Sequence, residues 1–292
     1  MLVPNISGST QIVGLFGFPV SHTLSPAMHN AAFAFLKLPY IYVPFHVETT
    51  KLSAAVEGIR ALNLRGVNVT IPHKEAVLTL LDHVTPEAAL IGAVNTITND
   101  NGVLIGHNTD GAGFIRELEG ALEQGIRQRN VLIFGTGGAA RGVAVSLALR
   151  GAGRIVIAGR TLQKARAITD VIGQKICDRC ASVIDISSPA LRDEITRADI
   201  IVNATPLGMR PHHEIPPFFD LHLCNPGVLI CDLVYNPMET SLVKSAHSLG
   251  LRTLTGIGML VWQGALAFEL WTGQKAPVEL MRHTVQKHFL SK

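Results

Sequence analysis

Acidic residues are missing from one long part of this chain. Residues 124–169 contain no Asp or Glu, although the whole chain has 22 acidic residues against 25 Lys and Arg. The basic residues of this part are Arg127, Arg129, Arg141, Arg150, Arg154, Arg160, Lys164 and Arg166. A charge run is usually a solvated face, but so long an acid-free stretch favours an anionic ligand. The net charge of +3 is too small to indicate a nucleic-acid partner.

Long hydrophobic runs are missing as well. No apolar run approaches the roughly 18 residues that a membrane helix needs, and the first residues, MLVPNISGST, lack the basic region of a secretory signal. Only 16% of the residues are charged and 47% are hydrophobic, which excludes a disordered chain. A length of 292 residues is enough for two domains. We therefore expect a soluble, cytoplasmic, enzyme-like α/β protein with no membrane partner.

Cysteine is scarce, with four residues in the chain. Cys177 and Cys180 have the C-x-x-C spacing of metal or redox sites, and His212, His213 and His222 lie in the same half of the chain, so zinc has to be considered. However, Cys224 and Cys231 form no second C-x-x-C, and Cys231 lies in a predicted buried strand. We expect reduced structural thiols and no metal.

A glycine-rich turn is the strongest single motif. The apolar run 131–134 predicts a buried strand, Gly135-Thr136-Gly137-Gly138 follows it, and a segment of helical period then extends to Gly151. A second apolar run covers residues 155–158. Glycines let a pyrophosphate approach the main chain at a helix N-terminus, where free N–H groups and the helix dipole favour an anion. The alternative is an ordinary tight turn, but the two flanking strands favour a nucleotide site.

Strands and helices alternate on both sides of this turn. Predicted strands before it cover residues 12–16, 40–46 and 66–72, with a hairpin turning at Asn101-Gly102. Predicted helices cover 25–36, 51–62, a segment from Thr85 and 110–122. Later strands are predicted near 183, at 199–204 and at 228–234, and later helices at 161–172, from 189, at 259–271 and at 277–289. This pattern predicts two α/β domains.

Polar residues gather where predicted strands end. Ser25 and Pro26 fit the N-cap and N1 positions of a helix, but capping leaves Thr23 unexplained. Lys74 follows His73 at a predicted helix start, where the helix dipole disfavours a cation and eases its deprotonation. Asp110 fits the N-cap of the next helix, so capping alone is a serious alternative to a functional role.

Several motifs together resemble the shikimate dehydrogenase family, including its quinate- and shikimate-using branch. They cover nearly the whole chain in the same order. The motifs are Gly17-Phe18-Pro19-Val20-Ser21-His22-Thr23-Leu24-Ser25-Pro26, Asn68-Val69-Thr70-Ile71-Pro72-His73-Lys74, Gly92-Ala93-Val94-Asn95-Thr96, Asn108-Thr109-Asp110-Gly111, the glycine turn, Gly258-Met259-Leu260 and Gln263-Gly264-Ala265.

The resemblance implies NADP-dependent, reversible reduction of 3-dehydroshikimate to shikimate, a step of aromatic amino-acid biosynthesis. It implies a substrate-binding domain over residues 1–110, a Rossmann-like NADP-binding domain over 111–255, and C-terminal helices over 256–292 that return to the first domain. It leaves a monomer and a homodimer both open.

The resemblance also implies roles for individual residues. Lys74 would exchange a proton with the reacting oxygen, and Asp110 would be its partner at the same hydroxyl. Thr23, Ser25 and Tyr235 would bind the substrate carboxylate, and Thr70, Asn95 and Gln263 the ring hydroxyls. The implied cofactor residues are Gly135, Thr136, Gly137, Gly138, Ala139, Gly159, Arg160, Thr161, Lys164, Thr205, Leu233 and Gly256.

Two positions depart from the common pattern of this family. Thr23 replaces a frequent serine, which adds a methyl group and leaves the choice between shikimate and quinate open. Gly159 replaces a frequent asparagine before Arg160-Thr161. Arg160 and Lys164 still favour NADP, because no acid between Gly135 and Asp170 is present to bind the ribose 2′-hydroxyl as expected for NAD. A dehydrogenase that prefers quinate or NAD, and a non-catalytic sensor on the same fold, are the alternatives.

Overall fold

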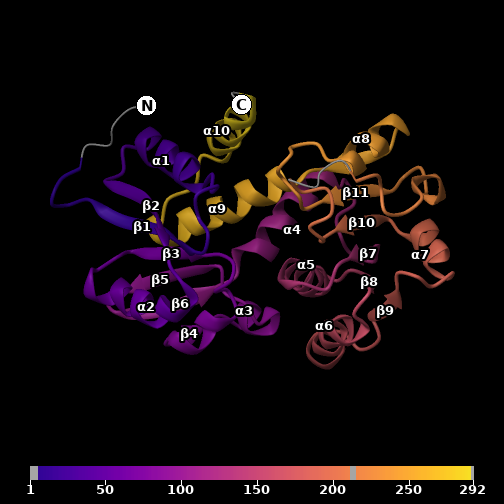
Figure 1. Ribbon diagram of the computed structural model, residues 1–292, viewed down its shortest axis with the longest axis horizontal. Coiled ribbons are helices and arrows are strands. Elements are labelled where there is room, and N and C mark those ends of the chain that lie inside the picture. Colours follow the sequence, from indigo (N-terminus) through magenta and orange to yellow (C-terminus); the bar gives the residue numbers. More distant parts are fainter. Residues whose placement is uncertain (1–5, 211–214, 291–292) are drawn as a thin grey trace. The chain divides into compact units, whose positions relative to one another are not determined.

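The computed structural model describes residues 6–210 and 215–290. The chain divides into two compact units (Figure 1). The first unit contains the chain up to Thr109 and again from Val261, and the second contains Asp110–Leu260. Each unit is built on its own six-stranded sheet, and this two-sheet α/β architecture confirms the predicted fold class.

The sheet of the first unit is mixed and has the order β2-β1-β3-β5-β6-β4. Its strands are β1 (Gln11–Gly17), β2 (Tyr40–His46), β3 (Gly66–Val69), β4 (His83–Val84), β5 (Thr96–Asp100) and β6 (Val103–His107). β1 pairs in parallel with β2 and β3, whereas β5 is antiparallel to β3 and β6. The β5–β6 hairpin turns at Asn101-Gly102 as predicted, and both residues have positive φ.

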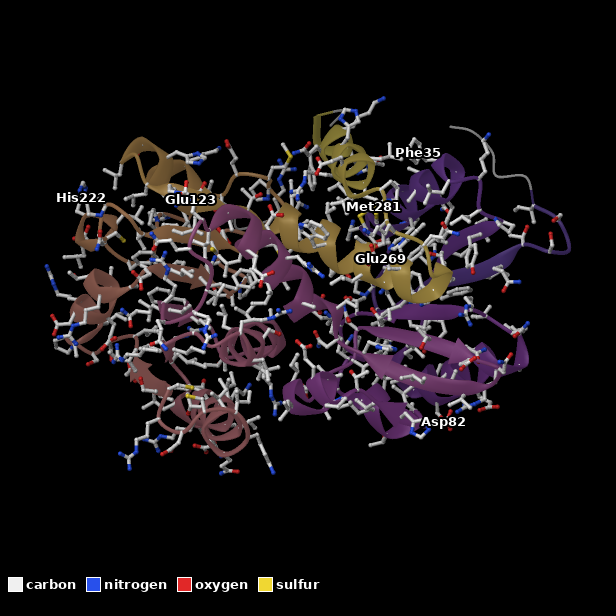
Figure 2. All side chains as sticks on the ribbon, turned by 180° about the vertical axis from the view of Figure 1, so that it is seen from behind. Phe35, Asp82, Glu123, His222, Glu269 and Met281 are labelled. Carbon is white, nitrogen blue, oxygen red and sulfur yellow. The ribbon has the colours of Figure 1, made fainter. Side chains whose placement is uncertain are left out.

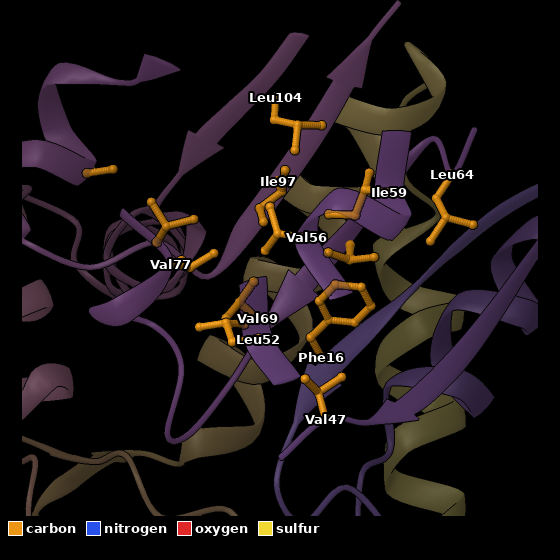
Figure 3. Packing of buried hydrophobic residues seen from close by; sticks show 13 residues of the cluster. Phe16, Val47, Leu52, Val56, Ile59, Leu64, Val69, Val77, Ile97 and Leu104 are labelled. Carbon is orange, nitrogen blue, oxygen red and sulfur yellow. The ribbon is translucent and has the colours of Figure 1, made fainter. Parts of the chain in front are cut away.

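The two faces of this sheet have different cores, because successive residues of a strand point to opposite sides. Val67 and Val69 of β3 pack with Val56 and Ile59 of α2 (Leu52–Ala61) in an aliphatic cluster (Figure 3). Asn68, between the two valines, therefore points to the other face. There its amide oxygen accepts a hydrogen bond from the Tyr42 hydroxyl. The first face is a plain hydrophobic core, and the second carries buried polar groups.

Aromatic rings from distant parts of the chain pack together on the second face of this sheet. Tyr42 stacks on His29 of α1 (Ser25–Phe35) with ring centroids 4.5 Å apart, and Trp271 of α9 (Gly256–Thr272) lies beside both rings. α10 (Val278–Leu290) packs on α1. Met281 of α10 is fully buried, whereas Phe35, the last residue of α1, is 63% exposed (Figure 2). The C-terminal helices thus complete the core of the first unit. α3 (Pro86–Ile91) and the short 3₁₀ segments Thr49–Lys51 and Ala76–Leu80 are its other helical elements.

The sheet of the second unit is entirely parallel, in the order β12-β11-β10-β7-β8-β9. Its strands are β7 (Asn130–Phe134), β8 (Arg154–Gly159), β9 (Ala181–Asp185), β10 (Ile200–Asn203), β11 (Leu229–Asp232) and β12 (Arg252–Leu254). The helices are α4 (Thr109–Ala121), α5 (Gly138–Leu149), α6 (Leu162–Lys175), α7 (Leu191–Arg197) and α8 (Ser241–Ser248). Counting from β7, this is the strand order of a Rossmann fold, whose ligands bind at the carboxyl ends of the strands.

Three local predictions are wrong. Ser25 is not an N-cap: it is the first residue of α1, which follows Leu24 without a side-chain cap. Asp110 is also not an N-cap, because α4 already begins at Thr109. Lys74 does not begin an α-helix, since the segment after β3 forms turns and then a 3₁₀ helix that starts only at Ala76. The expectation that a helix dipole eases deprotonation of Lys74 therefore has no basis in the structure.

Other differences concern the bounds of elements. α9 begins at Gly256 rather than at Met259, so Gly256 and Gly258 lie inside it. The helix α8 and the short strands β4 and β12 were not predicted, because each has ten residues or fewer and shows little periodicity.

The four cysteines are free thiols. Cys231 lies in the buried strand β11, as predicted. Burial raises the pKa of the Cys180 thiol to about 12. His212 and His213 of the considered zinc site lie outside the described residues. Among residues 6–210 and 215–290, no helix has both the length and the apolar character to cross a membrane.

Candidate active site

The glycine turn of the second unit has the geometry of an anion-binding loop. Gly135 has φ of +122°, and a side chain there would place its Cβ 2.8 Å from the carbonyl oxygen of Ala204. A Cβ on Gly137 or Gly138 would instead meet no described atom within 4 Å. Gly137 is the N-cap of α5, and Gly138 and Ala139 are exposed at its first turn. The start of this helix is therefore exposed and has room beside its backbone, which fits a pyrophosphate at a helix N-terminus.

The loop after β10 lies against this turn. Asn203, the last residue of β10, accepts hydrogen bonds on Oδ1 from the amide of Thr205 at 3.0 Å and from its hydroxyl at 2.6 Å. The Leu233 amide donates to the Asn203 carbonyl at 3.0 Å. A Cβ on Gly256 would lie 2.3 Å from the Leu233 carbonyl oxygen, so only glycine fits there. Thr205, Leu233 and Gly256, three predicted cofactor residues, are thus connected at one end of the sheet.

The end of β8 carries exposed cations. Arg160, Thr161 and Lys164 are exposed, and Thr161 is the residue before α6. Within residues 6–210 and 215–290, neither Arg160 nor Lys164 takes part in an ion pair. An unpaired guanidinium beside an ammonium is a suitable site for a phosphate group. This donor set fits the 2′-phosphate of NADP.

Gly159 has a packing reason to be glycine. A Cβ at this position would lie 2.5 Å from Cγ2 of Thr136, the second residue of the glycine turn. The threonine methyl group therefore occupies the space that a side chain at position 159 would need. The glycine at the end of β8 and the threonine in the glycine turn are therefore linked by packing.

In the first unit, Lys74 lies on a firmly held segment. The preceding His73 is fully buried, its Nε2 lies 2.7 Å from the Val47 carbonyl oxygen, and its amide donates to the Thr70 carbonyl. The Lys74 carbonyl accepts from the Val94 amide at 2.8 Å. The Lys74 side chain is half-buried. The main chain on both sides of this lysine is therefore fixed, although no α-helix begins there.

Thr70 is held by the end of β1. Its amide donates to the Phe16 carbonyl at 2.9 Å, and a Cβ on Gly17 would lie 2.3 Å from the Thr70 methyl group. Thr23 and Ser25 lie together on the loop before α1, where the Ser25 amide donates to the Thr23 hydroxyl at 3.3 Å. Ser25 is buried and Thr23 half-buried. Hydroxyl groups from two loops are thus presented by the carboxyl ends of β1 and β3.

Asn95 is the centre of a buried polar network. Its Nδ2 donates to the Thr109 hydroxyl at 2.9 Å and lies 3.5 Å from Oε1 of Gln263 on α9. Its Oδ1 accepts from the Thr109 amide at 2.7 Å. Two predicted substrate residues, Asn95 and Gln263, are therefore in contact. Asp110 follows Thr109 directly and is half-buried in the first turn of α4.

Some site residues belong to the second unit and others to the first. Tyr235, 37% exposed, lies on the loop after β11 in the second unit, as does Asp110 at the start of α4. Lys74, Thr23, Ser25, Thr70, Asn95 and Gln263 belong to the first unit.

Several buried polar residues hold the site although the sequence assigned them no role. These are Tyr42, Asn68, His73, Thr96, Thr109, Asn203, Asp232 and Thr240, all of them buried. A polar residue at the end of an apolar strand, such as Asn203 or Asp232, is the signal that was available for two of them.

These features are those of a dinucleotide-binding α/β protein with a second cluster of buried polar side chains. Three known domain families match the chain: the shikimate dehydrogenase substrate binding domain over residues 15–97, shikimate/quinate 5-dehydrogenase over 117–208, and the shikimate 5′-dehydrogenase C-terminal domain over 256–286. The chain is 48% identical over 282 residues to the shikimate dehydrogenase (NADP(+)) of Desulforamulus reducens, covering 97% of both chains.

Solved structures agree with this match. A shikimate dehydrogenase crystallised in complex with NADP+ aligns with a TM-score of 0.92 and 39% identity over 99% of both chains. The shikimate 5-dehydrogenase of Listeria monocytogenes, crystallised with shikimate and NAD, has a TM-score of 0.92 and 40% identity over 97% of this chain and 99% of its own. The chain belongs to the shikimate dehydrogenase family.

Proposed function

We propose that this protein is an NADP-dependent shikimate dehydrogenase that reversibly reduces 3-dehydroshikimate to shikimate. The observation that carries this proposal is the match at 48% identity, over 97% of both chains, to an NADP(+)-dependent shikimate dehydrogenase. The open glycine turn and the unpaired Arg160 and Lys164 support the cofactor. The buried hydroxyl and amide groups of the first unit support a small polyhydroxylated acid as the substrate.

Lys74 and Asp110 are proposed as the proton-transfer pair. As a carbonyl accepts hydride, negative charge grows on its oxygen, and a positioned ammonium can stabilise and then protonate that oxygen. Lys74 suits this role because its main chain is fixed by the buried His73 and by Val94. Asp110 accepts from the same hydroxyl and orients the lysine. NADPH, when bound, supplies the hydride.

The remaining polar groups are proposed to orient the substrate. Thr23, Ser25 and Tyr235 bind its carboxylate, and Thr70, Asn95 and Gln263 bind its ring hydroxyls. Each polar group left unpaired in a buried complex would cost about 1–3 kcal/mol, so these contacts select a ring that carries matching hydroxyls. The network around Asn95 favours this assignment, since it already fixes one amide against α9.

The glycine turn residues Gly135, Thr136, Gly137, Gly138 and Ala139 are proposed to bind the pyrophosphate. Gly159, Arg160, Thr161 and Lys164 would bind the adenosine end with its 2′-phosphate, and Thr205, Leu233 and Gly256 the nicotinamide half. We accordingly propose that the second unit is the NADP-binding domain, and that the first unit, with the C-terminal helices, is the substrate domain.

An absorbance assay of reduced nicotinamide tests the function. Shikimate with NADP+ is expected to give a steady rise in absorbance, and shikimate with NAD+ or quinate with NADP+ a much smaller kcat/KM. A folded protein that binds NADP+ but oxidises neither acid would be a sensor and would overturn the proposal. Better turnover of quinate would favour the alternative dehydrogenase, for which the half-buried Thr23 beside Ser25 is the supporting observation.

A further inference from the structure

Asp232, the last residue of β11, is a buried acid in an unusual setting. It is 0% exposed, and within residues 6–210 and 215–290 it forms no ion pair with Lys, Arg or His. Burial raises the pKa of this carboxyl group, against the hydrogen bonds it accepts. Removing a carboxylate from water is costly unless donors replace the water. Three donors do so here.

The three donors come from three different segments of the second unit. Asn203 Nδ2, at the end of β10, lies 2.9 Å from Oδ1 of Asp232. The Val234 amide, on the loop after β11, lies 3.0 Å from the same oxygen. The Thr240 hydroxyl, at the N-cap of α8, lies 2.5 Å from Oδ2. One carboxyl group thus connects the ends of two neighbouring strands to the start of a helix.

Two of these segments, the end of β10 and the loop after β11, carry a residue of the proposed nucleotide site or lie next to one. Asn203 presents its Oδ1 to the amide and hydroxyl of Thr205, so Thr205 is two hydrogen bonds away from Asp232. Asn203 Nδ2 also donates to the Leu207 carbonyl at 3.2 Å, which holds the rest of that loop. Leu233 lies between Asp232 and Val234. The loops 203–209 and 232–236 therefore share one buried anchor.

Stability alone does not account for this arrangement. A buried charge is seldom better for stability than apolar side chains of similar volume, whereas removing one partner of such a network leaves the others unsatisfied. The surrounding strands are packed with aliphatic residues such as Ile201, Val202 and Ile230, which shows that this sheet accepts apolar side chains readily. The carboxyl group occurs instead at the carboxyl ends of parallel strands, where ligands bind.

We propose that Asp232 is a positioning residue that orders the loops 203–209 and 232–236 for nucleotide binding. This inference rests on the proposed function only in that NADP+ is the nucleotide. Asp232 need not touch the nucleotide, because it acts through Asn203, Val234 and Thr240. Its loss is expected to weaken NADP+ binding by loosening Thr205 and Leu233, while the sheet below stays folded.

Two variants separate the contributions of geometry and charge. Asp232→Ala leaves Asn203 Nδ2, the Val234 amide and the Thr240 hydroxyl without their acceptor, and we expect NADP+ binding to weaken by about tenfold or more. Asp232→Asn keeps an acceptor oxygen for Asn203 and Val234 and offers Thr240 a donor in place of an acceptor. It removes the charge assistance and reverses the hydrogen bond with Thr240, so we expect a loss of about two- to fivefold.

Asp199 offers a matched control at the opposite end of the same sheet. Its carboxylate accepts from the Asn130 amide at 2.8 Å, just before β10 begins. Asp199→Ala also removes an acid that holds main chain in this unit, so it is expected to lower the melting temperature and leave the dissociation constant of NADP+ unchanged.

The experiment measures NADP+ binding by calorimetry and amide hydrogen exchange of residues 203–209 and 232–240 in wild type and all three variants. Weaker binding together with faster exchange in both loops for the Asp232 variants, but not for Asp199→Ala, would support the inference. A lower melting temperature with unchanged binding and loop exchange would overturn it. If Asp232→Ala does not fold, Asp232→Asn decides by the same criteria. Absence of shikimate turnover in wild type would refute the proposed function but leave both readouts intact.

Discussion

Thr109 holds the side-chain amide of Asn95 from both sides. Its amide donates to Asn95 Oδ1 at 2.7 Å, while its hydroxyl accepts from Asn95 Nδ2 at 2.9 Å. Thr109 also directly precedes Asp110 in the chain. It therefore connects Asn95, which is proposed to bind the ring hydroxyls, to a proposed catalytic residue. This pairing fixes which end of the Asn95 amide is the donor.

Replacing Thr109 by valine removes the hydroxyl and keeps the shape. Asn95 Nδ2 then loses a buried acceptor, so we expect the KM for shikimate to rise by about fivefold or more, with little change in the KM for NADP+. Steady-state kinetics measure both constants. Thr109→Ser should restore the wild-type value. Thr98→Val is the control, since this buried threonine bonds His107 outside the Asn95 network. Equal effects of Thr98→Val and Thr109→Val would refute the role.

Arg160→Ala tests the site for the 2′-phosphate. Because a charge-assisted contact to phosphate is lost, the KM for NADP+ should rise by about tenfold or more, whereas any activity with NAD+ should stay unchanged. Arg166→Ala is a suitable control, as Arg166 is an exposed arginine of α6, two residues beyond Lys164 and so on another face of that helix. An unchanged KM for NADP+ in Arg160→Ala would contradict the assignment.

Gly159 and Thr136 should behave as a coupled pair. Gly159→Ala brings a Cβ to within 2.5 Å of the Thr136 methyl group, so it should destabilise the protein by about 1–3 kcal/mol. Thr136→Ser removes that methyl group and should cancel much of the loss. Urea unfolding of both single variants and the double variant measures the coupling. Strictly additive effects would show that the two positions do not interact as the structure indicates.

His29 predicts a dependence of stability on pH. Burial lowers its pKa from 6.5 to about 3, and neither ring nitrogen has a hydrogen-bond partner among the described residues. Between these values the unfolded chain binds a proton that the folded protein does not. The free energy of unfolding should therefore fall as the pH drops below 6.5. His29 alone should contribute about 1.4 kcal/mol of this decrease per pH unit.

His29→Phe isolates the contribution of His29 to this pH dependence, because phenylalanine can stack on Tyr42 but does not titrate. Its unfolding free energy should fall less steeply between pH 6 and about 4 than that of wild type. His107, whose pKa burial also lowers, remains in both proteins and contributes equally. Parallel curves for the two proteins would show that His29 is not buried in its neutral form.

The fold was largely predictable because its signals are local. The strands β7 and β8 are apolar runs, and the turn between β7 and α5 needs glycine at position 135, where φ is positive and a Cβ would collide. Helix starts were less predictable. Ser25 and Asp110 have side chains suited to capping, yet Ser25 is the first residue of α1 and Asp110 the second residue of α4, since the sequence pattern does not determine where the first helical turn closes.

Only those residues of the proposed site that belong to a recognisable sequence motif could be predicted. Lys74 and Asp110 follow from the resemblance to a family, whereas Asp232 and Thr109 act through partners far away in the sequence. Thr109 faces Asn95 because β5 and β6 pair antiparallel, and Asp232 meets Asn203 because β10 and β11 are parallel neighbours. Such contacts exist only once the sheets have formed. For this reason single-residue patterns do not reveal them.

The kcat of Lys74→Ala for shikimate oxidation at saturating NADP+ tests the central claim most directly. If this lysine transfers the proton, kcat should fall by about 10² or more relative to wild type, with the circular dichroism spectrum and the dissociation constant of NADP+ unchanged. A folded Lys74→Ala variant that oxidises shikimate at the wild-type rate would contradict the account.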